Sequence, residues 1–275
     1  MHTYDIRLIA MDMDGTLLNS AQEISRENLS ALMEARRHGV TVAICSGRLP
    51  GDAGLYAINA GLLDCAILSL NGGYCLDRPD GTAYANHTLT GDALEMCLSV
   101  LVPMGMTFAC FLQNRIVVFS GSADQHSFTW ATYMEGEGAP ACFYGMEALE
   151  RIRADGVNKL VCLDPDAVRL EDARKRLKLI PGLEVTSSWP QNLELMPVGV
   201  NKGSAVCELA TRLCLTPRQV MAIGDYDNDE SMIAYAGLGV AMGNATCRIR
   251  KAARHVTLTN DEDGVAAAIR RFVLP

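Results

Sequence analysis

The sequence predicts an α/β fold, in which a doubly wound parallel-sheet (Rossmann-like) core carries an inserted α+β domain. In the two outer parts of the chain, short apolar runs alternate with amphipathic stretches. This alternation is typical of a parallel sheet with right-handed crossovers. In the middle of the chain, strand pairs joined by short turns are mixed with helices, which indicates a separate α+β unit. We predict the core at residues 1–81 and 191–275, and the insert at 82–190.

The first part of the core contains three strongly apolar runs, at 8–11, 40–45 and 66–70. Such runs are expected for strands that are covered on both faces of a sheet. Between the first two runs, Ser25 is a suitable N-cap and Gly39 a suitable end for a helix. The sequence therefore predicts consecutive βα units.

The rhythm changes at the turn-rich segment 77–81. Between this segment and residue 197 we predict strands at 106–112, 115–120, 159–163, 184–188 and 192–196, and helices at 124–135 and 170–179. The first two strands are separated by Gln113 and Asn114, which predicts a β-hairpin. From Pro197 on, the βα rhythm resumes. We predict helices at 201–213, after Asn228, through Arg250 and at the end of the chain to Phe272, strands at 220–223 and 255–258, and a strand followed by a turn within 237–243.

The composition bounds the class of protein. The 275 residues are 49% hydrophobic, which is enough for a large core, and the net charge is −8. An acidic chain argues against nonspecific binding to nucleic acid, which needs a basic face. None of the ten cysteines forms a C-x-x-C pair, and we find neither a leader peptide nor an apolar run of membrane-spanning length. We therefore expect a cytoplasmic protein with no membrane or nucleic-acid partner.

Polar residues follow several predicted core strands. Asp12 and Asp14 follow the first strand, Ser46 the second, and Asp225, Asn228 and Asp229 the strand at 220–223, while Lys202 opens a helix. Because the carboxyl ends of parallel strands share one edge of a sheet, we expect these groups to lie close together. Clustered carboxylates need a proton or a cation to offset their repulsion, and Mg²⁺ prefers carboxylate and phosphate oxygens. The pattern predicts a phosphoryl-transfer site.

Four segments resemble, in order, the motifs of the haloacid dehalogenase (HAD) superfamily. They are Asp12-Met13-Asp14-Gly15-Thr16, Ser46-Gly47-Arg48, Asn201-Lys202-Gly203 and Gly224-Asp225-x-x-Asn228-Asp229. More narrowly, the chain is similar to the Cof-type phosphatases with a class IIB cap, which is inserted between the second and third motifs. Further similarity lies at 71–72, 239–245 and 261–265. In the fourth motif, Glu230-Ser231 stands where relatives usually have an apolar residue or a proline.

The resemblance implies a role for each matching residue. Asp12 would be the nucleophile and Asp14 the general acid and base, while Ser46 and Lys202 would complete the catalytic group. Mg²⁺ would be held by Asp12 and Asp225 through their side chains and by Asp14 through its backbone carbonyl, with Asp229 as a further or supporting ligand. The remaining matches would bind substrate or support the phosphate loops: Thr16, Gly47, Arg48, Asn71, Gly72 and Asn228.

The implied activity is a Mg²⁺-dependent phosphatase that hydrolyses a small soluble phosphomonoester, with a sugar phosphate as one candidate, through an aspartyl-phosphate. The insert would be a cap that selects the leaving group. One alternative is a phosphomutase or phosphotransferase of the same superfamily. Another is a phospho-aspartate signalling module, although such modules are shorter and carry no insert of this size. The sequence leaves the oligomeric state open.

Overall fold

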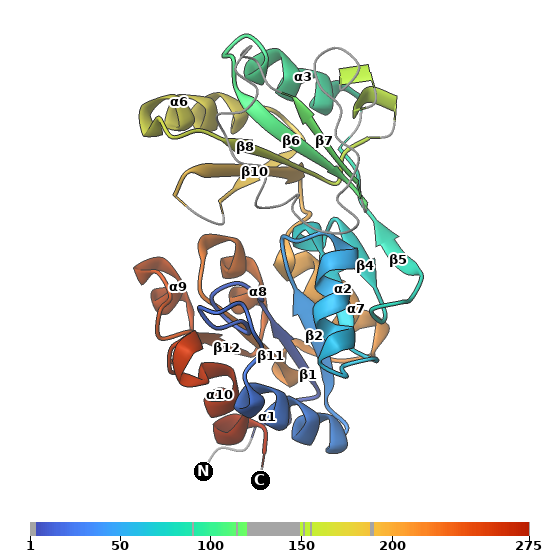
Figure 1. Cartoon of the computed structure of the whole chain (residues 1–275), viewed down its shortest axis with the longest axis vertical. Coiled ribbons are helices and arrows are strands. Elements are labelled where there is room, and N and C mark those ends of the chain that lie inside the picture. The colour runs from blue at the N-terminus through green and yellow to red at the C-terminus, as the bar shows by residue number, and fades with distance from the viewer. Residues whose placement is uncertain are drawn as a thin grey trace. The chain divides into compact units, whose positions relative to one another are not determined.

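The computed structural model describes residues 4–274, except 90, 114, 120–148, 151, 155 and 188–189. The chain divides into two compact units (Figure 1). The first comprises Met1–Ala85 and Asn201–Pro275, and the second comprises Asn86–Val200. The predicted helix at 124–135, Asn114 of the predicted turn, and Cys142 lie outside the described residues.

The first unit is built on a sheet whose strand order, over the described residues, is β13-β12-β11-β1-β2-β3-β4-β5. The strands are β1 Leu8–Met11, β2 Thr41–Cys45, β3 Ala66–Ser69, β4 Tyr74–Leu76, β5 Ala83–Asn86, β11 Val220–Gly224, β12 Leu238–Ala241 and β13 His255–Val256. Strand β1 lies at the centre and pairs in parallel with β2 and β11. All four of its residues are fully buried, which explains its unbroken apolar run.

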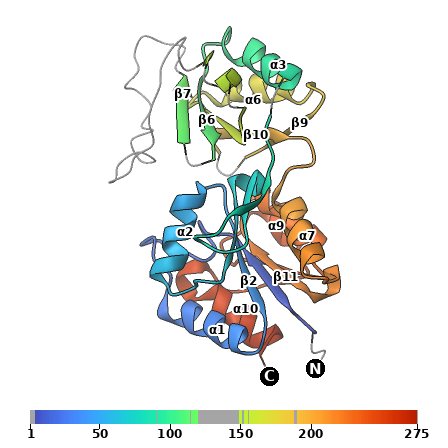
Figure 2. The ribbon, with the colours of Figure 1, turned by 90° about the vertical axis from the view of Figure 1, so that its right-hand side faces the viewer.

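Helices cover both faces of this sheet, which makes the core doubly wound. They are α1 Arg26–Arg37, α2 Pro50–Asn59, α7 Lys202–Arg212, α8 Glu230–Tyr235, α9 Cys247–Ala252 and α10 Gly264–Phe272. Apolar residues of α1, α2 and α10 form one cluster with one face of the sheet, and α7 packs with the opposite face (Figure 2). Short 3₁₀ turns complete the unit at Leu70–Gly72, Pro217–Gln219, Asp227–Asp229 and Asn260–Glu262.

The sheet differs from the wholly parallel one that we predicted. Strand β4 runs antiparallel to β3, and β5 extends the same edge. The reversal occurs where Leu70 and Asn71 adopt positive φ angles of 53° and 55°. A strand of three residues such as β4 carries too short a pattern to be recognised in the sequence. Strand β13 is also shorter than predicted.

The second unit contains a sheet with the order β7-β6-β8-β10-β9 in the described residues. The strands are β6 Thr107–Leu112, β7 Arg115–Phe119, β8 Lys159–Leu163, β9 Leu183–Thr186 and β10 Asn192–Pro197. The antiparallel pairings of β6 with β7 and of β9 with β10 agree with the predicted strand pairs. Helices α3 Gly91–Leu101 and α6 Ala167–Leu177 share an apolar cluster with this sheet. The sequence did not predict α3.

The predicted domain limits and the two compact units do not divide the chain at the same places. The unit boundaries fall at 85/86 and 200/201, whereas we predicted 81/82 and 190/191. Residues 83–85 of strand β5 belong to the first unit because β5 extends the sheet next to β4. Strand β10 joins the second because it pairs with β8 and β9. The domain limits stay a prediction.

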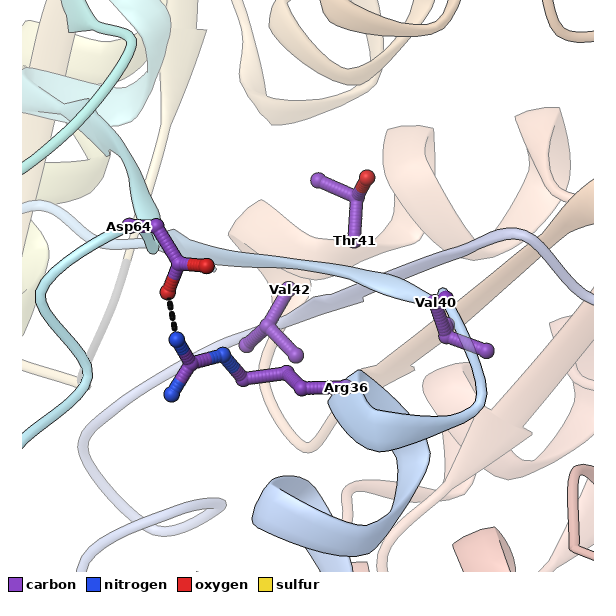
Figure 3. A pocket seen from close by; sticks show the side chains of 6 residues that line it. Arg36, Val40, Thr41, Val42 and Asp64 are labelled. Carbon is purple, nitrogen blue, oxygen red and sulfur yellow. Dashed lines mark hydrogen bonds and ion pairs between the residues drawn. The ribbon is translucent and has the colours of Figure 1, made fainter.

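A depression of about 220 Å³ lies at the amino-terminal end of β2 (Figure 3). It is lined by Arg36, Gly39, Val40, Thr41, Val42 and Asp64. Arg36 and Asp64 form an ion pair there. Open α/β sheets bind their ligands at the carboxyl ends of the strands, so this depression lies at the opposite edge from the expected site. None of the described helices has the length and apolarity that crossing a membrane requires.

The hydrogen bond between Asn28 and the start of α10 is expected to stabilise the first unit. Its buried side chain accepts from the Ala266 N–H (2.9 Å) at the start of α10, whose own N-cap, Asp263, makes no side-chain cap bond. Asn28→Ala would leave that donor unpaired, so we expect the free energy of unfolding to fall by about 1–3 kcal/mol in urea titrations. Glu27→Ala is the matched control. Its ion pair with Arg270 joins the same helices on the surface, and its loss should cost less than about 1 kcal/mol. Equal losses would contradict this account.

Candidate active site

Asp12 lies directly after β1, at the carboxyl edge of the sheet. Its N–H donates to the Ile223 carbonyl of β11 at 3.0 Å, which continues the parallel pairing by one residue. The acids that follow β11 are therefore brought beside Asp12, although more than 200 residues of chain separate them. Asp12 is only 6% exposed. The carboxyl ends of β1 and β11 thus meet as the sequence predicted.

Lys202 connects this edge to α7. Asn201 caps α7 through a reciprocal pair of hydrogen bonds with Ser204, which fixes the first turn. From there, the buried Lys202 Nζ reaches Asp12 Oδ1 at 2.5 Å and Asp229 Oδ1 at 2.6 Å. An ammonium group is buried at acceptable cost only when it is paired, and here two carboxylates pair with it.

Asp225 and Asp229 are held by their own loop and by the loop after β1. Asp229 Oδ2 accepts the N–H groups of Asp225 (2.8 Å) and Tyr226 (3.0 Å). Asp225 Oδ1 accepts from Thr16 Oγ1 at 2.8 Å. The approach of the two loops depends on Gly15, which has a φ of +76° and where a Cβ would lie 2.5 Å from Asp225 Oδ2. Thr16 and Gly15 therefore shape the loop around Asp225.

These groups form an acidic cluster. One carboxylate oxygen from each of Asp12, Asp225 and Asp229 lies within 4.8 Å of the others. Burial, followed by repulsion from Asp229, raises the pKa of Asp12 well above its usual range in spite of Lys202. The same two causes raise the pKa of Asp225 to about 7. Burial alone lowers the pKa of Lys202, but Asp12 and Asp229 outweigh it and raise the pKa above its usual value.

The donor set of this cluster fits a hard divalent cation. Three closely spaced carboxylates face the ammonium group of Lys202, and burial together with repulsion between the acids raises the pKa values of Asp12 and Asp225. Mg²⁺ is bound by oxygen ligands of this kind. The residues present are therefore suitable for holding the ion that the sequence predicted.

The Asp14 carboxylate belongs to a separate network. It accepts two hydrogen bonds from Arg48, from Nε at 2.9 Å and from Nη2 at 2.6 Å. The chain leaves strand geometry after Asp12, where a turn covers Met13–Thr16. Alternation along an extended strand would place Asp12 and Asp14 on one side, but this turn separates their carboxylates into two networks.

The loops after β2 and β3 bring the predicted substrate-binding residues to the same edge. The Arg48 N–H donates to the buried Ser46 Oγ (3.1 Å), and Gly47 lies between these two residues. The Ser46 carbonyl accepts from the Asn71 N–H at 3.0 Å. Asn71 Oδ1 in turn accepts from Asn228 Nδ2 at 3.3 Å.

The loop that contains Gly72 fits closely against the start of α7. Gly72 has a φ of +97°, and a Cβ there would lie 2.7 Å from the Asn201 carbonyl oxygen. Only glycine allows this combination of a left-handed backbone and close approach. The contact brings the loop after β3 beside the residue that precedes Lys202.

Three residues that support the site were not among the site residues predicted from the sequence. Ser231 Oγ accepts the Gly203 N–H at 3.0 Å, and a Cβ on Gly203 would lie 2.5 Å from the Ser231 carbonyl oxygen. Ser231, which departs from the usual motif, therefore joins α8 to the start of α7. Asn244 Nδ2 donates to the Gly15 carbonyl at 2.8 Å. Asp52 accepts from Arg48 Nη1 at 3.0 Å, and its only sequence signal is the i,i+4 spacing.

Comparisons with known proteins show which family this chain resembles. The model of the haloacid dehalogenase-like hydrolase family matches residues 9–269. The chain is 34% identical over 270 residues to the 5-amino-6-(5-phospho-D-ribitylamino)uracil phosphatase YcsE of Bacillus subtilis, with 98% of this chain and 97% of that protein covered.

Solved structures show the same fold over nearly the whole chain. A haloacid dehalogenase-like hydrolase from B. subtilis is 30% identical, with a TM-score of 0.85 and with 96% of this chain and 99% of that chain covered. A sugar phosphatase of HAD subclass IIB is 22% identical, with a TM-score of 0.83 and with 98% and 100% covered. The chain therefore belongs to the haloacid dehalogenase-like hydrolases, has the fold of subclass IIB, and is a hydrolase of phosphate esters.

Proposed function

We propose that this protein is a Mg²⁺-dependent phosphatase that hydrolyses a small phosphomonoester through an aspartyl-phosphate on Asp12. The observation that carries the proposal is the buried contact of Lys202 with Asp12 and Asp229 beside Asp225. This contact orients Asp12 through one oxygen, Oδ1, and leaves Oδ2 outside that hydrogen bond. Catalysis of phosphoryl transfer depends mainly on such positioning and on charge compensation.

In the first step, Asp12 attacks phosphorus, and its carboxylate oxygen forms a bond to phosphorus as the bond to the ester oxygen breaks. Asp14 gives its proton to that ester oxygen, so the alcohol leaves uncharged. In the second step, water attacks phosphorus and gives a proton to Asp14, and the Asp12–phosphorus bond breaks. Inorganic phosphate is released and both side chains return to their starting states.

Other residues bind the phosphoryl group and balance its charge. The ammonium group of Lys202 offsets charge on Asp12 and on the phosphoryl oxygens. Ser46 would hydrogen-bond the phosphoryl oxygens, and Thr16 and Asn228 would support the loops or the phosphate. The other substrate-binding residues would be Gly47 and, nearer the leaving group, Arg48, Asn71 and Gly72. Mg²⁺, held by Asp12, Asp225 and the Asp14 carbonyl, would supply positive charge to the transferring group. Both oxygens of Asp229 already accept hydrogen bonds, which favours a supporting role for this residue.

The substrate that we propose is a small phosphomonoester, with a sugar or sugar-alcohol phosphate as the first candidate. The support comes from relatives: YcsE acts on 5-amino-6-(5-phospho-D-ribitylamino)uracil, and a structural neighbour is a sugar phosphatase. A screen of phosphate release should include both kinds of ester. A phosphatase releases inorganic phosphate in proportion to the ester consumed, whereas a phosphomutase would return an isomeric phosphate and little inorganic phosphate.

The nucleophile is tested by Asp12→Asn. The amide keeps the shape of the side chain but cannot form the aspartyl-phosphate, so we expect kcat to fall by roughly 10⁴-fold or more. Asp5→Asn, which changes an exposed acid ahead of β1, is the matched control and should keep full activity. Substantial turnover by a pure, folded Asp12→Asn protein would exclude the mechanism.

The acidic cluster is tested by Asp225→Asn in the metal-free protein. The raised pKa of Asp225 means that keeping this group ionised above pH 7 destabilises the fold, and an amide removes that cost while still accepting from Thr16. In EDTA at pH 8 we expect the Tm to rise by about 2–6 °C. Added Mg²⁺ should raise the Tm of the wild-type protein but leave that of the variant unchanged. A lower Tm for the variant in EDTA would contradict this reading.

Protons should compete with Mg²⁺ at this site. With a pKa of about 7, Asp225 is largely protonated at pH 6 and largely ionised at pH 8 when no metal is bound. Binding of Mg²⁺ must release that proton, so the apparent affinity should weaken by about tenfold between pH 8 and pH 6. Isothermal titration in two buffers with different ionisation enthalpies measures both the affinity and the proton release. Equal affinity at both pH values would refute the prediction.

A further inference from the structure

Arg48 is held by more than its contact with Asp14. Its Nη1 donates to Asp52 at 3.0 Å, and its Nη2 donates to Gln22 at 2.8 Å as well as to Asp14. Its guanidinium carbon lies 5.1 Å from the centre of the Tyr56 ring. The guanidinium therefore offers one edge, Nε and Nη2, to Asp14 and a different nitrogen to Asp52.

The anchors of Arg48 lie on one face of α2. Asp52 and Tyr56 are four residues apart, which places them one above the other on the helix. Pro50 in the first turn pre-sets the backbone of this helix. Asp52 has a side chain that is 46% exposed, so its ion pair contributes little to stability. Stability alone is a weak explanation for this arrangement.

Asp52 holds Arg48 independently of Asp14. Asp52 accepts from Nη1, whereas Asp14 accepts from Nε and Nη2, so the two acids use different nitrogens of one guanidinium. Because Asp52 lies on α2, its contact fixes the guanidinium relative to that helix, and the Nε–Nη2 edge then fixes the place of the Asp14 carboxylate.

We propose that Asp52 is a positioning residue: it holds Arg48 against α2 so that the Nε–Nη2 edge keeps the Asp14 side chain aligned for proton transfer to the leaving group. The inference rests on the proposed function, in which Asp14 is the general acid and base. Asp52 itself touches no reacting atom. Its effect is therefore on the alignment of Asp14. A small displacement of a catalytic group from its reacting position lowers the reaction rate strongly.

The test compares two esters of similar size whose leaving groups differ in basicity. Benzyl phosphate releases a strongly basic alkoxide and needs the proton of Asp14, whereas p-nitrophenyl phosphate releases a weakly basic phenoxide and does not. The parameter is kcat/KM, which reports on the steps up to departure of the alcohol. We expect Asp52→Asn and Asp52→Ala to lower kcat/KM for benzyl phosphate by about tenfold, and for p-nitrophenyl phosphate by less than about twofold.

Conservative and remote variants complete the experiment. Asp52→Glu keeps the carboxylate and should restore kcat/KM for benzyl phosphate to within about twofold of the wild-type value. Asp64→Asn removes the acid of the Arg36–Asp64 pair at the opposite edge of the sheet (Figure 3). It should leave kcat/KM unchanged for both esters.

An equal loss on both esters, with a lowered Tm, would show that Asp52 only stabilises α2 and would overturn the inference. No loss on either ester would overturn it as well. The proposed function is judged separately, by the wild-type protein and Asp12→Asn. If the wild-type protein hydrolyses neither ester nor any member of the phosphate panel, the proposed function fails and the inference fails with it.

Discussion

The rest of the site depends on the buried ion pairs that the ammonium group of Lys202 forms with Asp12 and Asp229. This group joins two carboxylates that the chain places 190 residues before it and 27 residues after it. Removing an ammonium group from water is expensive, so the pairing must be short and well oriented. The close packing around it serves that end: Asn201 caps the helix that carries Lys202, and Gly203 allows α8 to approach.

The same interaction leaves a deficit of positive charge. One ammonium group cannot neutralise Asp12, Asp225 and Asp229 together, and repulsion from Asp229 adds to burial in raising the pKa values of Asp12 and Asp225. The fold keeps the acids together in spite of their repulsion because parallel pairing of β1 with β11 fixes their backbones. The three carboxylates are thus held close enough together to bind a cation.

One turn separates the carboxylates of Asp12 and Asp14, the two acids of the first motif. If the chain had continued as a strand, Asp12 and Asp14 would have crowded the same cluster. Because of the turn at Met13–Thr16, Asp12 instead accepts a hydrogen bond from Lys202, and Asp14 accepts hydrogen bonds from Arg48. Asp12 and Asp14 therefore have different cationic partners, although they are only two residues apart in the chain.

The amino-acid sequence by itself determined the features that depend on local patterns. Apolar runs identified β1, β2, β3 and β11, and Ser25 and Asn201 marked the starts of α1 and α7. Since parallel strands share one edge, the acids that follow β1 and β11 could be expected to meet. The resemblance of four short motifs then indicated the family, which the whole-chain match confirmed.

Only the tertiary structure decided the features that depend on contacts between distant segments. Strand β4 is recognisable because it pairs with β3, and Ser231 matters because α8 packs against the start of α7. The separation of Asp14 from Asp12 also leaves no periodic trace in the chain, and the i,i+4 spacing of Arg48 and Asp52 did not by itself identify their contact. Periodicity records which side of an element is buried, whereas the partner of a polar side chain is fixed only when the elements pack.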